Sequence, residues 1–191
     1  MEPFKTIKSI GTPLDKVNVD TDQIIPKQFL KLVQKTGFGQ YLFYDWRFTT
    51  DGTPKEDFVL NNPKYRGSKI LLTRDNFGCG SSREHAAWAL LDYGFLVVIS
   101  PSFADIFYNN CFKNGILPIK LDAKKIESLF KIKSEIEVNL ENQTITIPNE
   151  TISFHIERYR KKTLLEGLDD ISITLQYEDK ISQYEKSKTV S

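Results

Sequence analysis

The sequence predicts an α/β fold with a mainly parallel central sheet. Three short and almost continuous apolar runs, residues 70–72, 95–99 and 116–119, are typical of strands that are covered on both faces. Two segments with helical spacing of apolar residues separate these runs, at 86–93 and 103–111. This β-α-β-α-β order implies right-handed crossovers, which place strand ends and helix starts along one edge of the sheet.

The bulk composition is that of one globular domain over residues 1–191, with a charged tail from about residue 177. The 191 residues are 40% hydrophobic and 27% charged, with a formal net charge of +1. So small a net charge excludes a generic polyanion binder. The N-terminus has no apolar signal region, and the apolar run 86–91 is too short to span a bilayer. We therefore expect a soluble, cytoplasmic protein.

The cysteine content limits what the chain can bind. Cys79 and Cys111 are its only cysteines, which excludes a disulfide framework and suits a reducing compartment. A structural zinc site or an iron–sulfur cluster usually needs three or four Cys or His ligands, and His85 and His155 lie in unrelated settings. We expect no metal or cofactor on this chain, so any cluster must come from another polypeptide.

The N-terminal third is less regular. Residues 18–26 contain Asp20 and Asp22 and end in a proline, which predicts an Asx-type turn and a loop entering a short strand. The next segment, 27–40, is compatible with a short helix that ends at glycines. Residues 45–67 combine turn-forming and aromatic residues without a clear period, which favours a packed loop that could serve as a docking surface.

Towards the C-terminus, residues 122–133 have the spacing of an amphipathic helix. Alternating apolar residues at 136–140 and 145–147 predict a half-exposed hairpin, followed by a strand at 152–156. The basic run 158–162 is better explained as a solvated helix face than as a nucleic-acid patch, because the total charge is nearly neutral.

Glycines and possible caps mark the ends of the two central helices. Gly94 and Gly115 stand where C-terminal glycines belong. Ser102 followed three residues later by Asp105 resembles an N-terminal capping box for the second helix.

The stretch 76–86, between the first of these strands and the first helix, carries the most distinctive chemistry. Ser81 followed three residues later by Glu84 is itself a capping box, and capping alone is the simplest role for this serine. Capping does not explain the two glycines at 78 and 80, or Ser82 and Arg83. Together with the free N–H groups of a helix start, these residues predict an anion site.

A serine at such a site can act as a base only if its alkoxide is stabilised. Backbone N–H groups and Arg83 could do this in the manner of an oxyanion hole, which predicts proton abstraction from an anionic substrate. The Gly-x-Ser-x-Gly pattern of serine hydrolases and the phosphate and dinucleotide loops are absent. Cys79 lacks an identifiable base, His85 is better explained as a packing residue, and Cys111 as a core thiol.

Five segments occur in an order and spacing that resemble the small subunits of 3-isopropylmalate dehydratase, in the aconitase superfamily. They include Asp-Thr-Asp-Gln at 20–23 and Gly-Ser-Ser-Arg-Glu at 80–84. The full set covers nearly the whole chain and comprises residues 18–26, 76–86, 102–110, 114–118 and 165–175.

This resemblance implies a three-layer β/β/α swivelling domain that closes over a [4Fe-4S] cluster held by a separate large subunit. The implied reaction converts 2-isopropylmalate to 3-isopropylmalate through isopropylmaleate, in leucine biosynthesis. The resemblance assigns Ser81 to removal of the substrate proton, Asp22 to an active-site acid, and Arg83, Ser82 and Lys31 to substrate contacts. The segment 26–31 lies where related proteins choose between an isopropyl group and an extra carboxylate, and Lys31 matches a position at which a basic side chain can contact substrate.

Two alternatives remain open from the sequence. The chain could be the small subunit of a related hydro-lyase that acts on citraconate, methylmalate or homoaconitate. It could also be a non-catalytic binding domain that has the same fold. The motif segments alone do not show turnover.

Overall fold

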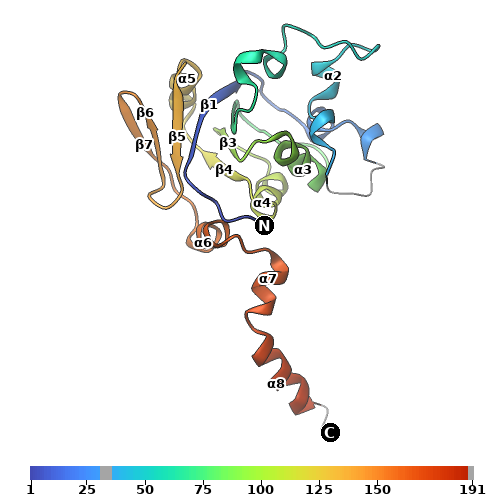
Figure 1. Cartoon of the computed structure of the whole chain (residues 1–191), viewed down its shortest axis with the longest axis vertical. Coiled ribbons are helices and arrows are strands. Elements are labelled where there is room, and N and C mark those ends of the chain that lie inside the picture. Colours follow the sequence, from blue (N-terminus) through green and yellow to red (C-terminus); the bar gives the residue numbers. More distant parts are fainter. Residues whose placement is uncertain (31–35, 189–191) are drawn as a thin grey trace.

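A seven-stranded sheet with the order β4-β3-β2-β1-β5-β6-β7 forms the centre of the protein (Figure 1). The structure is a computed structural model and describes residues 1–30 and 36–188. Strands β1 to β4 are parallel to their neighbours, whereas β1, β5, β6 and β7 pair antiparallel. The strands are β1 (Ile7–Leu14), β2 (Ile70–Thr73), β3 (Val97–Ser100), β4 (Leu117–Lys120), β5 (Glu135–Asn139), β6 (Thr144–Ile147) and β7 (Glu150–Ser153).

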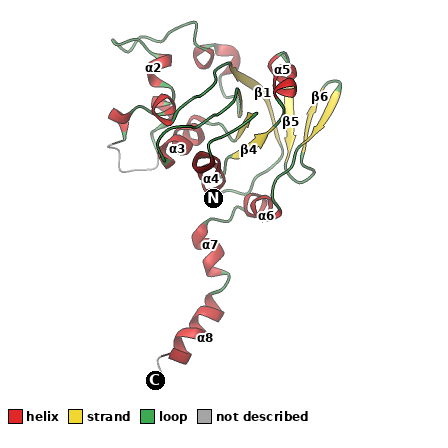
Figure 2. Cartoon of the chain, turned by 180° about the vertical axis from the view of Figure 1, so that it is seen from behind, coloured by secondary structure: helices red, strands yellow, loops and turns green. Residues whose placement is uncertain are grey.

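The helices alternate with the parallel strands as the sequence predicts, in the order β2-α3-β3-α4-β4. Figure 2 shows the helices in red, with α3 and α4 side by side. The described helices are α1 (Thr21–Ile24), α2 (Tyr44–Arg47), α3 (Glu84–Tyr93), α4 (Asp105–Lys113), α5 (Ala123–Phe130), α6 (Arg158–Glu166), α7 (Asp170–Leu175) and α8 (Glu178–Lys188). Short 3-10 turns are η1 (Lys27–Phe29), η2 (Gly39–Tyr41), η3 (Val59–Asn61) and η4 (Pro63–Tyr65).

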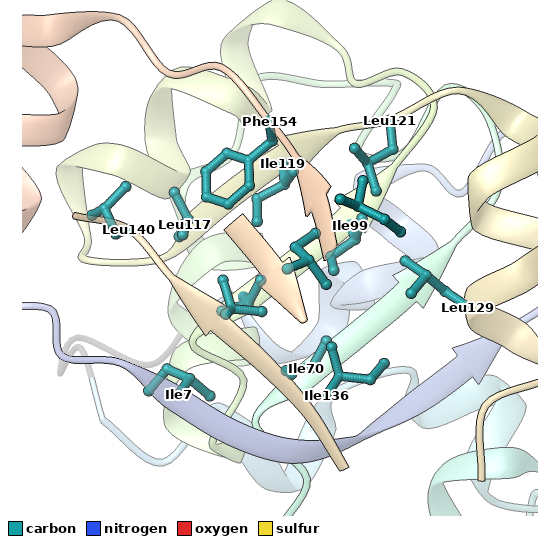
Figure 3. Close-up of a cluster of buried hydrophobic side chains, with 14 of the residues drawn as sticks. Ile7, Ile70, Ile99, Leu117, Ile119, Leu121, Leu129, Ile136, Leu140 and Phe154 are labelled. Carbon is teal, nitrogen blue, oxygen red and sulfur yellow. The ribbon is translucent and has the colours of Figure 1, made fainter. Parts of the chain in front are cut away.

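Alternation along the parallel strands divides the buried side chains into two cores. Leu71 and Val98 belong to a core shared with α3 and α4. Ile70, on the opposite face, packs in a second core that includes Ile136 of β5 and Leu129 of α5 (Figure 3). The antiparallel strands, together with α5 and α6, thus cover one face of the parallel sheet, and α3 and α4 cover the other. The α/β fold class and its three-layer β/β/α arrangement are confirmed.

Two predictions in the N-terminal third are wrong. The turn predicted at the aspartates of 18–26 is present, but it leads into the single helical turn α1 and not into a strand. Asp20 and Gln23 make a capping box: the Asp20 carboxylate accepts from Gln23 N (2.8 Å) and Gln23 Oε1 accepts from Asp20 N (3.0 Å). The described part of 27–40 holds only η1 and η2 instead of one helix, and residues 31–35 lie outside the described structure.

The predicted C-terminal ends of α3 and α4 are confirmed, whereas the predicted N-terminal cap of α4 is wrong. Gly94 ends α3 with a φ of 116°, and Gly115 follows α4 with a φ of 85°, as expected for C-terminal glycines. The Ser102 capping box is wrong, since α4 begins at Asp105. The Ser102 hydroxyl instead accepts from Asn76 N at 2.8 Å, which joins the loops that follow β3 and β2.

The loop over residues 45–67 is packed, as predicted. The rings of Phe43 and Trp46 stack with centroids 5.6 Å apart, and Phe58 packs against both. Arg47 donates to the carbonyl oxygens of Gly39 and Gln40 in η2 and of Leu42 directly after it, and burial lowers the pKa of its guanidinium. The loop is therefore clamped to the η2 turn.

The C-terminal third contains the predicted amphipathic helix and hairpin, but β7 ends at Ser153, so His155 lies outside the strand. The basic run forms α6, where the Arg160 guanidinium lies over the rings of Tyr108 and Phe112 and is not simply solvated. Beyond α6, α7 and α8 lead away from the rest of the protein (Figures 1 and 2). Within residues 1–30 and 36–188, no helix is long and apolar enough to cross a membrane.

Replacing Gly39 with alanine tests the contact between η2 and the end of α3. A Cβ at residue 39 would lie 2.6 Å from the backbone nitrogen of Tyr93 and 2.7 Å from the carbonyl carbon of Asp92. Because backbone cannot move aside cheaply, we expect Gly39→Ala to lower the free energy of unfolding by about 3 kcal/mol. Gly67→Ala is the control, since its φ is 76° but nothing lies within 4 Å, and should cost about 1 kcal/mol. Equal losses in urea denaturation would contradict the predicted clash.

Candidate active site

The loops that follow β1, β2 and β3 meet at the carboxyl edge of the parallel strands. Single bridges join Asp20 to Cys79 and Phe77 to Phe103. The backbone N–H of Gly78 donates to the carbonyl of Val19 at 2.8 Å. The predicted gathering of strand ends and helix starts along one edge is confirmed.

The glycine turn is held by contact with α4. Gly78 has a φ of 77° and Gly80 a φ of 90°, which glycine adopts without strain. A Cβ on Gly78 would lie 2.1 Å from Cγ of Phe107, so no larger residue fits there. The close approach that this glycine permits is to the Phe107 ring.

The predicted capping of α3 by Ser81 is wrong. Helix α3 begins at Glu84, and its N-cap is Arg83, whose backbone is extended with φ −135° and ψ 114°. Ser81 and Ser82 are exposed, and the Ser81 carbonyl accepts from the Thr21 hydroxyl at 2.9 Å. As far as the structure describes side chains, none caps the N-terminus of α3 or that of α4. Both helix starts therefore present backbone donors that a side chain has not satisfied.

These two helix starts face one cavity of about 280 Å³. It is lined by Thr21, Gly78, Gly80, the segment 81–83 and the first residues of α4, 104–107. The partial positive charge of each helix N-terminus favours an anion here, and the volume suits a small molecule. Asp105 also lines the cavity and contributes an opposing negative charge at its rim.

Asp22 links two cations beside this cavity. Arg83 Nη1 is paired with Asp22 Oδ1, and Lys27 Nζ lies 3.5 Å from Asp22 Oδ2. The Arg83 side chain is only 14% exposed, so its charge is partly screened from water. The group of Arg83, Lys27 and Asp22 carries one excess positive charge, which the Asp105 carboxylate at the cavity opposes.

The structure brings together four of the five predicted site residues. Asp22 and Arg83 form an ion pair, while Ser81, Ser82 and Arg83 line the cavity. Lys31 lies outside the described residues. Lys27 was missed by sequence reasoning, because its partner Asp22 is recognisable only once α1 and η1 are placed side by side.

The cysteines and His85 behave as structural residues. Burial, followed by the nearby Asp20 carboxylate, raises the pKa of the Cys79 thiol, which keeps it protonated and poorly nucleophilic near neutral pH. Complete burial raises the pKa of Cys111, confirming it as a core thiol. His85 packs against the Phe38 ring with centroids 5.3 Å apart, and burial lowers the pKa of its imidazole.

Metal-binding groups do not converge in the described part of the chain. Among residues 1–30 and 36–188, no three His, Cys, Asp or Glu side chains lie close enough to hold a metal ion. Cys111 lies in α4 and is fully buried in the core.

Comparisons place the sequence and fold among known proteins. Residues 1–124 match the aconitase C-terminal domain family. The 3-isopropylmalate dehydratase small subunit of Brevibacillus brevis is 59% identical over 97% of this chain and 98% of its own length, and that of Oceanobacillus iheyensis 55% over 98% and 100%. A crystal structure of 3-isopropylmalate dehydratase from Methanocaldococcus jannaschii superposes with a TM-score of 0.67 at 27% identity, covering 95% of this chain and 99% of that chain.

Alkylation of Cys79 tests its assignment as a thiol that does not attack substrate. Because burial raises its pKa, the thiolate fraction at pH 7.5 should be smaller than that of a free cysteine. We expect iodoacetamide to modify Cys79 more slowly than N-acetylcysteine, with the pH midpoint of the rate shifted upward. Peptide mass spectrometry resolves Cys79 from the buried Cys111, which should react more slowly still. Faster reaction of Cys79 than of the free thiol would reopen a nucleophilic role.

Proposed function

The chain belongs to the aconitase C-terminal domain family and, within it, to the small subunits of 3-isopropylmalate dehydratase, and on that premise we propose how it serves the reaction. The reaction is the conversion of 2-isopropylmalate to 3-isopropylmalate by dehydration to isopropylmaleate and rehydration, in leucine biosynthesis. The names of the matched relatives favour this substrate over those of the citraconate and homoaconitate hydro-lyases.

The observation that carries the proposal is the position of Ser81. Its exposed side chain stands at a cavity onto which two uncapped helix starts open, with Arg83 two residues away. A serine alkoxide placed there would be stabilised by the backbone donors and by the guanidinium. We assign Ser81 the removal of the substrate proton, with the proton passing to its oxygen.

The stabilisation that two helix starts give to a negative charge is too small to make Ser81 a strong base in this chain alone. Each exposed helix start stabilises a negative charge by about 0.3–1 kcal/mol, which is less than the 1.36 kcal/mol that corresponds to one pKa unit. Two such contributions cannot make a water-exposed serine hydroxyl an effective base near neutral pH. Exclusion of water by a second protein surface would strengthen the same donors several-fold. The exposure of Ser81 therefore supports a site that is completed by the large subunit.

Asp22, Arg83 and Ser82 complete the contribution of this chain. The Arg83 guanidinium can bind a substrate carboxylate through two parallel hydrogen bonds, and the Ser82 hydroxyl can donate to the same group. Asp22, the acid of the site, holds Arg83 and Lys27 at the cavity and limits the positive charge between them. The substrate contact of Lys31 is proposed from the family resemblance alone.

The iron–sulfur cluster that the reaction uses is assigned to the partner subunit. The described residues do not suit an iron–sulfur cluster, since Cys111 is buried and no cluster of ligands forms. We therefore assign the [4Fe-4S] cluster to the large subunit, together with departure and return of the substrate hydroxyl. The free thiols Cys79 and Cys111 suit a reducing compartment, and we infer that the complex works in the cytoplasm.

Replacing Ser81 with alanine tests the assignment of the base. Assayed with the large subunit and an intact cluster, Ser81→Ala should lower kcat by about a hundredfold or more, because the group assigned to take the proton is removed. Ser128→Ala, on the exposed side of α5, is the matched control and should turn over normally.

Near-normal turnover of Ser81→Ala would exclude Ser81 as the base. Each subunit is also assayed alone, and activity from this chain by itself would contradict the two-subunit proposal. Citraconate is tested beside 2-isopropylmalate, and faster turnover of citraconate would contradict the assigned substrate.

A second substitution, Arg83→Lys, tests the planar contact. Lysine keeps the charge but replaces the guanidinium fork by a point charge, so bidentate binding to a carboxylate is lost. We expect kcat/KM for isopropylmalate to fall by about tenfold or more. Arg66→Lys, at an exposed loop position, is the control. An unchanged kcat/KM in Arg83→Lys would make Arg83 a residue of the helix surface only.

A further inference from the structure

Helices α7 and α8 form a tail, residues 170–188, that starts from a fixed point on the body. Asp169 accepts hydrogen bonds from the backbone N and the hydroxyl of Ser172, both at 2.7 Å, and the N-terminal ammonium lies 3.7 Å from its carboxylate. Gly167 has a φ of 66°, and a Cβ there would lie 2.7 Å from the Met1 carbonyl. The tail then leads away from the body in both views (Figures 1 and 2).

An apolar stripe, meaning the exposed apolar side chains of α7 and α8 and of Tyr177 between them, runs along this tail. The spacing of 177, 181 and 184 is i, i+4, i+7, and 171 and 175 are four residues apart, so each set lies along one helix face. The side chains are between 40% and 72% exposed: Ile171, Leu175, Tyr177, Ile181 and Tyr184. Helices as short as these are marginal in water unless a packed face supports them. The stripe therefore needs a surface to cover it.

We propose that the apolar stripe of the tail docks on the large subunit. This contact is additional to the one at the candidate active site, at the carboxyl edge of the parallel strands. This inference rests on the proposed function. The partner surface it requires is an apolar groove that accepts one amphipathic helix through anchors at i, i+4 and i+7.

A second copy of this chain is a poorer occupant, because the stripe is too short. At 11 residues, α8 is about 16 Å long, whereas a self-sufficient coiled coil repeats its apolar seam over about three to four heptads. The next position along the stripe is Lys188, whose ammonium lies over the Tyr184 ring at 5.8 Å. A seam that ends in a lysine after two turns can add to another contact but cannot hold two chains together alone.

Relatives named as small subunits point to the same occupant. Those of Brevibacillus brevis and Oceanobacillus iheyensis match 97% and 98% of this chain, too much to leave out a tail of this length. The tail is thus shared by chains that are separate small subunits. Such a subunit lacks the effective concentration that a covalent link provides, and a second docking contact restores part of it.

The tail and the site lie at opposite ends of the parallel strands. The tail starts beside Met1, ahead of β1, whereas the site loops follow the ends of β1 to β3. The eight residues of β1 separate these ends by about 26 Å. Tail docking should therefore change how tightly the subunits bind without changing the chemistry at Ser81.

The test measures binding of the full chain to the large subunit. The double variant Ile181→Ser with Tyr184→Ser removes two anchors at little change in helix propensity, and Gln183→Ser is the control on the other side of α8. We expect the double variant to raise the Kd from titration calorimetry by about tenfold or more. At saturating large subunit its kcat should equal that of the wild type, and Gln183→Ser should leave both values unchanged.

The outcomes separate this inference from the proposed function. If the wild type fails to bind the large subunit, the proposed function fails, and the inference with it. If the wild type binds and the double variant binds equally well, only the inference fails. The inference is also overturned if the kcat of the double variant at saturating large subunit falls. It is overturned as well if the isolated wild type sediments as a dimer and the double variant as a monomer, which would make a second copy of this chain the partner of the tail.

Discussion

The packing of the Gly78 backbone against the Phe107 ring is the contact on which the candidate site depends. It brings the turn that carries Ser81 down onto the first turn of α4, so that the starts of two helices open on one small cavity. A side chain at residue 78 would separate the two elements. The parallel sheet supports this arrangement from below, because its strands deliver the three loops to the same edge.

This arrangement leaves both helix starts without the stabilisation of a side-chain cap. A side-chain cap usually stabilises a helix by about 1 kcal/mol, and serines stand nearby in each case. Neither is used: Ser81 lies three residues ahead of Glu84 with an extended backbone between them, and the Ser102 hydroxyl is committed to Asn76. Open helix starts that local sequence could have capped are typical of sites where backbone donors are kept for a ligand.

The charged groups near Ser81 are also insufficient by themselves to activate the serine. Asp22 holds Arg83 and Lys27 in place, yet the serine stands in water, where such charges act weakly. The ligands of a metal centre do not converge anywhere in the described structure. At the far end of the parallel strands, the tail leads away from the body (Figures 1 and 2), and its large apolar side chains are exposed. Both ends of the molecule are thus suited to a second chain.

The sequence by itself determined the alternating helices and strands, the hairpin, and the glycines that end α3 and α4. Each of these depends on neighbours within a few positions, where periodicity and turn chemistry are decisive. Tertiary structure decided what depends on distant residues: the start of α3 at Glu84, the role of Gly78 and the contact of Lys27 with Asp22. The strand expected after the turn at 18–26 does not form because the Asp20–Gln23 capping box outweighs the strand preference of two adjacent isoleucines. Packing between segments about sixty residues apart brings Asp22 to Arg83, and no local pattern encodes that distance.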